Sequence, residues 1–133
     1  MPIQYMIPTE LVQTRALSPV PAQARRELQA LLESTDWPGD TADIVLAVHE
    51  ALINAQRHAG GATSAVAAVQ DERALVVEVR DEGPGFDVEE HARQAPDPLA
   101  ERGRGLWLIT QIAAGWEVQR QGRETCLRLR FQP

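Results

Sequence analysis

The stretch that decides the fold is VHEALINAQRHA, residues 48–59. Its Ala, Leu and Ile residues predict a helix, yet Glu50, Asn54 and His58 recur every four residues and so lie on one side of it. Apolar residues such as Ile53 flank this polar row in helical projection. Because the helix is apolar nearly all round, we expect it to be buried on two faces, with Glu50 and Asn54 lining a cleft.

A Glu and an Asn four residues apart can be read in two ways. In many amphipathic helices such a pair lies on the surface and stabilises the helix by about 0.2–0.5 kcal/mol. The pair also suits joint chemistry, since Asn supplies an uncharged oxygen to a hard cation such as Mg²⁺ and Glu accepts a proton from a nucleophile. A phosphate site elsewhere in the chain would favour the second reading.

The segments before this helix are predicted from local patterns. LVQTRAL, residues 11–17, is typical of a strand, and ARRELQALLES carries the apolar stripe of a helix that begins near Pro21. Pro and Gly within residues 36–40 end that helix. The next helix runs to about Ala59 and stops at Gly60–Gly61, because glycine accepts a positive φ.

The segments after the helix alternate between strands and one further helix. TSAVAAVQ and ALVVEVR predict a hairpin that turns at residues 71–73, and GWEVQR and TCLRLRF predict a second one that turns near residues 121–123. Between the hairpins lie a long polar loop and a short helix, LWLITQIAA. This order predicts an α+β two-layer sandwich, with helices on one face of a mostly antiparallel, mixed sheet.

The first glycine segment, DEGPGF, comes directly after a predicted strand. Asp81 ends that strand, while Gly83 and Gly85 let the backbone turn sharply and let a flat ligand approach without interference from a Cβ. A carboxylate facing a heterocycle accepts a hydrogen bond from an exocyclic amino group, so adenine is one candidate ligand. A plain turn fits the same residues equally well.

The second glycine segment, RGRGL, precedes the short helix. Gly103 and Gly105 expose N–H groups at the positive end of a helix dipole, where phosphates commonly bind. Arg102 and Arg104 add positive charge, although they also suit a solvated basic segment. Leu106 then begins the apolar run of the helix.

In chain order, the motifs are E-x-x-x-N on a helix, D-x-G-x-G after a strand and G-x-G-L before a helix. This arrangement resembles the GHKL ATPase superfamily, which shares the Bergerat nucleotide-binding fold. The resemblance extends from about Val12 to Phe131. The length of the chain and the forms VHEALINAQRHA and GRGLWLI are most similar to RsbW/SpoIIAB-type anti-sigma factor serine/threonine kinases.

The resemblance implies a role for each motif residue. Asn54 would coordinate Mg²⁺ on the phosphates of ATP, Glu50 would be the catalytic general base, and Asp81 would bind the adenine amino group. His58 would support the site without acting in catalysis, and residues 86–102 would form a flexible ATP lid. The other nucleotide-binding residues that the resemblance implies are Gly83, Gly85, Arg102, Gly103, Arg104, Gly105, Leu106 and Thr125.

The implied function is phosphorylation of a small anti-anti-sigma (antagonist) protein by Mg-ATP in a partner-switching pathway. A sigma factor is a possible second partner, and members of this superfamily often form homodimers. Two alternatives stay open. The chain could be an ATP-gated binding module without kinase activity, or a separately encoded catalytic domain of the histidine-kinase type that acts in trans.

Composition narrows the remaining choices. A chain of 133 residues with 44% hydrophobic residues predicts one self-supporting domain, spanning residues 1–133. A net charge of −6 disfavours nucleic acid and anionic membranes as partners. The absence of a long apolar run and the lone Cys126 fit a cytoplasmic protein. Cys126 alternates with leucines on its strand, so we expect a small filler on the face of Arg128 and Arg130.

Overall fold

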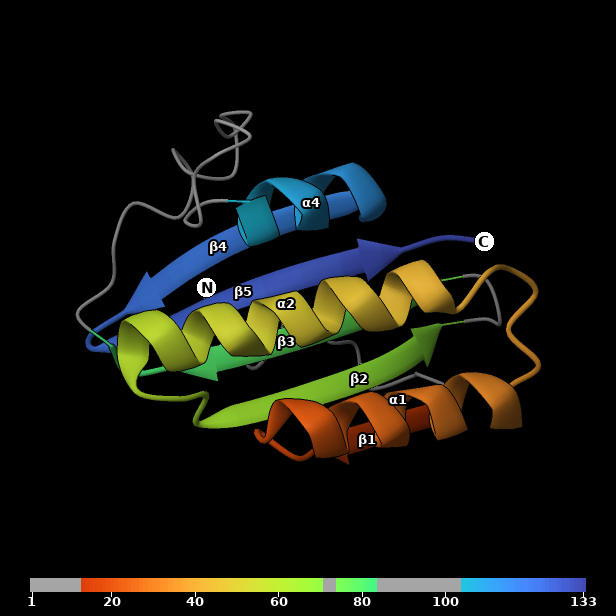
Figure 1. Cartoon of the computed structure of the whole chain (residues 1–133), viewed down its shortest axis with the longest axis horizontal. Coiled ribbons are helices and arrows are strands. Elements are labelled where there is room, and N and C mark those ends of the chain that lie inside the picture. The colour runs from red at the N-terminus through yellow and green to blue at the C-terminus, as the bar shows by residue number, and fades with distance from the viewer. Residues whose placement is uncertain (1–12, 71–73, 84–103) are drawn as a thin grey trace.

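The computed structural model describes residues 13–70, 74–83 and 104–133. Within these segments the elements follow the predicted order of strand, two helices, hairpin, helix and hairpin (Figure 1). Their bounds are Gln13–Leu17 (β1), Pro21–Ser34 (α1), Ala42–Ala59 (α2), Ser64–Gln70 (β2), Ala74–Asp81 (β3), Arg104–Ile112 (α4), Gly115–Gln121 (β4) and Glu124–Phe131 (β5). No helix in this part of the chain has the length and apolar character that a membrane span needs.

The strands form one sheet in the order β1-β2-β3-β5-β4, and all four described pairings are antiparallel. The described strands therefore contain none of the parallel pairing that a mixed sheet would have. In Figure 1 the three described helices lie on one face of the sheet, so the predicted α+β two-layer architecture is confirmed. The strand that leads into the first glycine segment, β3, lies at the centre of the sheet.

The side chains of β3 alternate between the two faces of the sheet as its sequence predicts, but residues 74–79 are buried on both faces. Leu75, Val77 and Val79 are nearly inaccessible to solvent and belong to the core under the helices. Glu78 and Arg80 lie on the opposite face, where an Arg80 nitrogen is 2.9 Å from a Glu78 oxygen. Glu78 is nevertheless only 3% exposed, which simple alternation does not predict.

Helix α2 lies between α1 and α4 and crosses the middle of the sheet (Figure 1). Val48 and Leu52 are each 1% exposed, and Ala47 and Ala51 are similarly buried. The expectation of burial on more than one face is therefore confirmed, since α2 packs against α1, α4 and β3. The helix ends at Gly60 with a φ of 77°, the left-handed cap that its sequence predicts.

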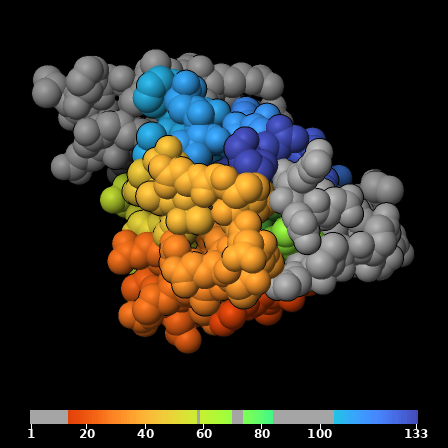
Figure 2. All heavy atoms as spheres, turned by 90° about the vertical axis from the view of Figure 1, so that its right-hand side faces the viewer, coloured from red at the N-terminus to blue at the C-terminus, as the bar shows by residue number. Residues whose placement is uncertain are grey.

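The connection between α1 and α2 packs against the last residue of the chain. A Cβ built on Gly39 would lie 3.1 Å from the Cα of Pro133 and 3.3 Å from the indole nitrogen of Trp37. Figure 2, which views the molecule from this end, shows the orange connection next to the blue C-terminal residues. Trp37 is 8% exposed and belongs to the core, so its indole serves packing here.

Two glycines allow a matched test of the helix cap. At both Gly60 and Gly115 an added Cβ would meet no atom within 4 Å in the described part of the chain, but only Gly60 of the two has a positive φ. Gly60→Ala should therefore lower the free energy of unfolding by about 1 kcal/mol, which is the cost of holding an alanine in the left-handed backbone conformation. Gly115→Ala should cost nothing, since alanine suits an extended strand better than glycine. Denaturant unfolding of both variants tests this, and equal losses would contradict it.

Candidate functional site

Glu50 and Asn54 meet the first turn of α4. A Cβ built on Gly105 would lie 2.8 Å from Oε2 of Glu50 and 3.1 Å from Nδ2 of Asn54, so at this point only a glycine fits without displacing them. The two side chains lie one helical turn apart on α2 and are half-buried. The structure thus places the helix motif E-x-x-x-N against the second glycine segment, although about fifty residues separate them in the sequence.

The start of α4 differs from the sequence prediction. We expected the helix to begin after the glycines, at Leu106, whereas it begins at Arg104 and contains Gly105 in its first turn. The first four N–H groups of a helix have no partner within it, so the N-terminus of a helix such as α4 can donate to an outside acceptor. Leu106 is 5% exposed and anchors this turn in the core. An anion at this position would also meet the positive end of the helix dipole.

Asp81 and Thr125 lie opposite each other on β3 and β5. They share the helix-facing side of the sheet, because they continue the alternation of Val79 and Leu127. The backbone N–H of Gly83 donates to Oδ1 of Asp81 at 3.1 Å, which fixes the start of the turn after β3. This row brings together the two residues for which the resemblance implies contact with adenine.

The pairing of β4 with β5 places Arg120 in this row with Asp81 and Thr125, although its sequence pattern did not predict a role. It pairs with Thr125 across the β4–β5 hairpin and therefore extends the row from Asp81 towards the edge of the sheet. Gly122 at the tip of the hairpin has a φ of 62°. The sequence did carry a signal for this position, because a turn near residues 121–123 places residue 120 opposite residue 125.

Two buried polar atoms at this site have no hydrogen-bond partner among the described residues: Nδ2 of Asn54 and Oγ1 of Thr125. A buried polar group without a partner costs about 1–3 kcal/mol. Such groups persist in proteins where a ligand supplies the missing partner. Together with the close approach of Gly105 to Glu50 and Asn54, they fit a nucleotide whose phosphates lie near Asn54 and whose adenine lies near Thr125.

Several predicted site residues lie outside the described part of the chain. These are Gly85, Arg102 and Gly103, together with the proposed lid at residues 86–102. The backbone of Arg104 is described but its side chain is not, and the same holds for His58. Their roles stay predictions.

The contact at Gly105 predicts a change in local geometry with little change in stability. In Gly105→Ala the new methyl group should displace the Glu50 carboxylate and the Asn54 amide, while the gain in helix propensity of about 1 kcal/mol offsets the crowding. We expect the unfolding free energy to stay within about 1 kcal/mol of wild type, whereas the NMR signals of the Asn54 side-chain amide shift. Unmoved Asn54 signals in this variant would contradict the contact.

Comparisons with known proteins identify the family of this chain and a similar fold. Residues 16–131 match the family model of the histidine kinase-like ATPase domain. The fold is similar to that of the histidine kinase AdeS from Acinetobacter baumannii, with a TM-score of 0.50 and 14% sequence identity over 90% of this chain and 67% of that one. A search of curated proteins gave no match. Because the family match spans the described fold and all three motifs, this chain belongs to the histidine kinase-like ATPase domain family.

Proposed function

We propose that this protein is a cytoplasmic serine/threonine kinase that binds Mg-ATP between α2 and α4 and phosphorylates a small antagonist protein. The observation that carries the proposal is the contact of Gly105 with Glu50 and Asn54. It gathers a carboxylate, a carboxamide and the N-terminus of a helix at one point. Phosphoryl transfer needs a proton acceptor, an oxygen ligand for the metal and donors for phosphate oxygens, and these groups supply all three.

The phosphate end of the site contains the chemistry. Asn54 would hold Mg²⁺ through its amide oxygen, and the backbone N–H groups of Gly105 and Leu106 would donate to phosphate oxygens. When bound, Mg²⁺ neutralises part of the charge on the phosphates. Glu50 accepts the proton of the attacking hydroxyl as the new bond from oxygen to the γ-phosphorus forms and the bond from that phosphorus to the leaving ADP oxygen breaks.

The other end of the site would recognise the adenine of the nucleotide. The carboxylate of Asp81 would accept a hydrogen bond from the amino group of adenine, and the buried hydroxyl of Thr125 would bind next to it. Gly83, which is buried, would let the base approach the backbone after β3. Because the phosphates and the base are held at different places, each end can be tested separately.

The choice of a serine or threonine acceptor rests on the resemblance of VHEALINAQRHA and GRGLWLI to the anti-sigma factor kinases. In a partner switch of that kind, the kinase would bind a sigma factor until the unphosphorylated antagonist protein replaces it. A small antagonist protein encoded next to this chain's gene would be the first substrate to try. A homodimer would present two such sites to its partners.

Glu50→Gln tests whether Glu50 acts as the general base. The substitution keeps the size of the side chain but removes its ability to accept a proton, so transfer should fall by about 10²–10⁴-fold. ATP affinity should change little, because Asn54, Asp81 and the α4 N-terminus remain. The measurement combines radiolabelled transfer to the antagonist protein with calorimetry of ATP binding. Glu33→Gln, an exposed carboxylate on α1, is the control and should behave as wild type.

The product identifies the class of activity. An acid-stable phosphoserine or phosphothreonine on the antagonist supports the proposal. An acid-labile phosphohistidine on a partner would instead indicate a histidine-kinase-type domain acting in trans. If the chain binds its partner only in the presence of ATP and transfers no phosphate to it, the chain is a binding module. Phosphoryl transfer by Glu50→Gln at the wild-type rate would refute the assignment of Glu50 as the general base.

Thr125→Val tests the adenine end of the site through two opposite effects, one on stability and one on ATP affinity. Valine has nearly the shape of threonine but lacks the hydroxyl, which is buried without a partner among the described residues. The unfolding free energy of the ligand-free protein should therefore stay equal or rise by up to about 1–2 kcal/mol. ATP affinity should fall by roughly tenfold, because a hydrogen bond to the nucleotide is lost. A variant that loses stability and keeps full ATP affinity would show that the hydroxyl serves the fold.

A further inference from the structure

The face of the sheet opposite the helices has a cavity of about 360 Å³ on its β4 side. It is lined by residues 115–117 of β4 and by Arg128 and Arg130 of β5. Both arginines alternate with Thr125 along β5, so they project from the other face of the sheet. The cavity is therefore separate from the proposed nucleotide site.

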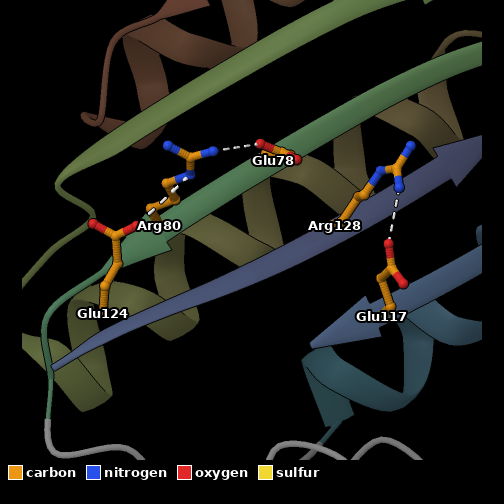
Figure 3. A network of polar contacts seen from close by, with 5 residues as sticks. All are labelled: Glu78, Arg80, Glu117, Glu124 and Arg128. Atoms are coloured by element: carbon orange, nitrogen blue, oxygen red, sulfur yellow. Dashed lines mark hydrogen bonds and ion pairs between the residues drawn. The ribbon is translucent and has the colours of Figure 1, made fainter. Parts of the chain in front are cut away.

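Arg128 has a carboxylate on each side. It lies in register between Glu78 on β3 and Glu117 on β4, and its Nη1 is 2.9 Å from Oε1 of Glu117 (Figure 3). Glu78 is bound to Arg80, but burial raises the pKa of Glu78 more than Arg80 lowers it. The side chain of Glu117 is 50% exposed, and ion pairs of such exposure contribute at most about 1 kcal/mol. Another anion can compete for Arg128.

Arg130 has no such neighbours. Two residues further along β5, it lies in register between Val76 and Gly115, neither of which carries a charge. Within the described segments it forms no ion pair, and it is exposed. Its guanidinium group therefore retains its full set of donors next to the cavity.

Neither backbone geometry nor close packing explains why Gly115 is a glycine. It is not among the glycines with positive φ, and a Cβ at this position would meet no atom of the described residues within 4 Å. A glycine weakens a strand, so a side chain would be expected here on grounds of stability alone. What the missing side chain does provide is open space beside Arg130.

We propose that this cavity is a binding site for an oxyanion, a carboxylate or a phosphate group, held by Arg130 and Arg128. Residues i and i+2 of a strand lie about 6.5–7 Å apart on one face, which lets two guanidinium groups approach one anion from two sides. The planar fork of each arginine matches the geometry of both oxyanions. Gly115 provides the room for the anion. Because the net charge of −6 gives no long-range attraction to anions, the affinity arises from these local contacts.

The test uses NMR titration of the intact chain at constant ionic strength. One arm adds inorganic phosphate and the other adds a triglutamate peptide. Binding should produce saturable shifts of the Gly115 and Glu117 amides and of the Arg130 side-chain N–H in at least one arm. A stronger response to phosphate indicates a phosphoryl ligand, and a stronger response to the peptide indicates an acidic protein segment. Phosphate at the α4 N-terminus would shift Gly105 instead, so the two sites are read independently.

Three variants make the result decisive. Arg130→Gln should weaken binding by about tenfold or more, because a charge-assisted pair is lost. Gly115→Val should abolish it by filling the space, with no loss of stability because valine favours strands. Arg123→Gln removes an equal charge from the exposed β4–β5 turn and should bind as wild type. No saturable shift in either arm would overturn the proposal, as would wild-type binding by Arg130→Gln or Gly115→Val, or equal weakening by Arg123→Gln.

Discussion

The contact between α2 and α4 is the constraint on which the rest of the structure depends. The side chains of Glu50 and Asn54 can keep their positions only where α4 lacks a side chain, and Gly105 meets that condition. The contact needs α2 to be held from its other sides, which α1 and the central strand β3 accomplish. The unusual apolar character of α2 follows from this position, since a helix with three neighbours has little surface left for water.

The sheet connects the two ends of the site. Its central strand β3 ends at Asp81, and the neighbouring β5 brings Thr125 into the same row. Buried polar atoms at both ends lack partners within the described residues, which costs free energy that the core of the domain must offset. Proteins generally tolerate such groups where they serve binding. These unpartnered atoms therefore indicate that the site is adapted to bind a ligand and not to give maximal stability.

Much of this fold could be predicted from the sequence, because each element has a strong local signal. The Gly60 cap, the apolar stripes of the helices and the alternation in β3 depend on near neighbours in the chain. The E-x-x-x-N spacing likewise placed Glu50 and Asn54 on one side of a helix. Cys126 was predicted to be a small filler on its strand; it is 1% exposed, and burial raises the pKa of its thiol to about 11, which disfavours the reactive thiolate.

The remaining features depend on pairing between distant segments, which a single sequence does not specify. Local rules place a helix start after a glycine pair, yet packing against α2 draws Gly105 into the first turn of α4. The burial of Glu78 and the open space at Gly115 likewise follow from the register of neighbouring strands. Tertiary packing thus decides between arrangements that local propensity leaves equal.

We infer that Mg-ATP binds where α2 contacts α4. Calorimetry of ATP binding with and without Mg²⁺, on the wild-type chain and on Asn54→Ala, tests it most directly. The account predicts that the wild-type chain binds ATP, that Mg²⁺ strengthens this binding, and that Asn54→Ala loses the strengthening while it still binds ATP. A folded wild-type chain that does not bind ATP, or an Asn54→Ala variant with the full effect of Mg²⁺, would contradict the account.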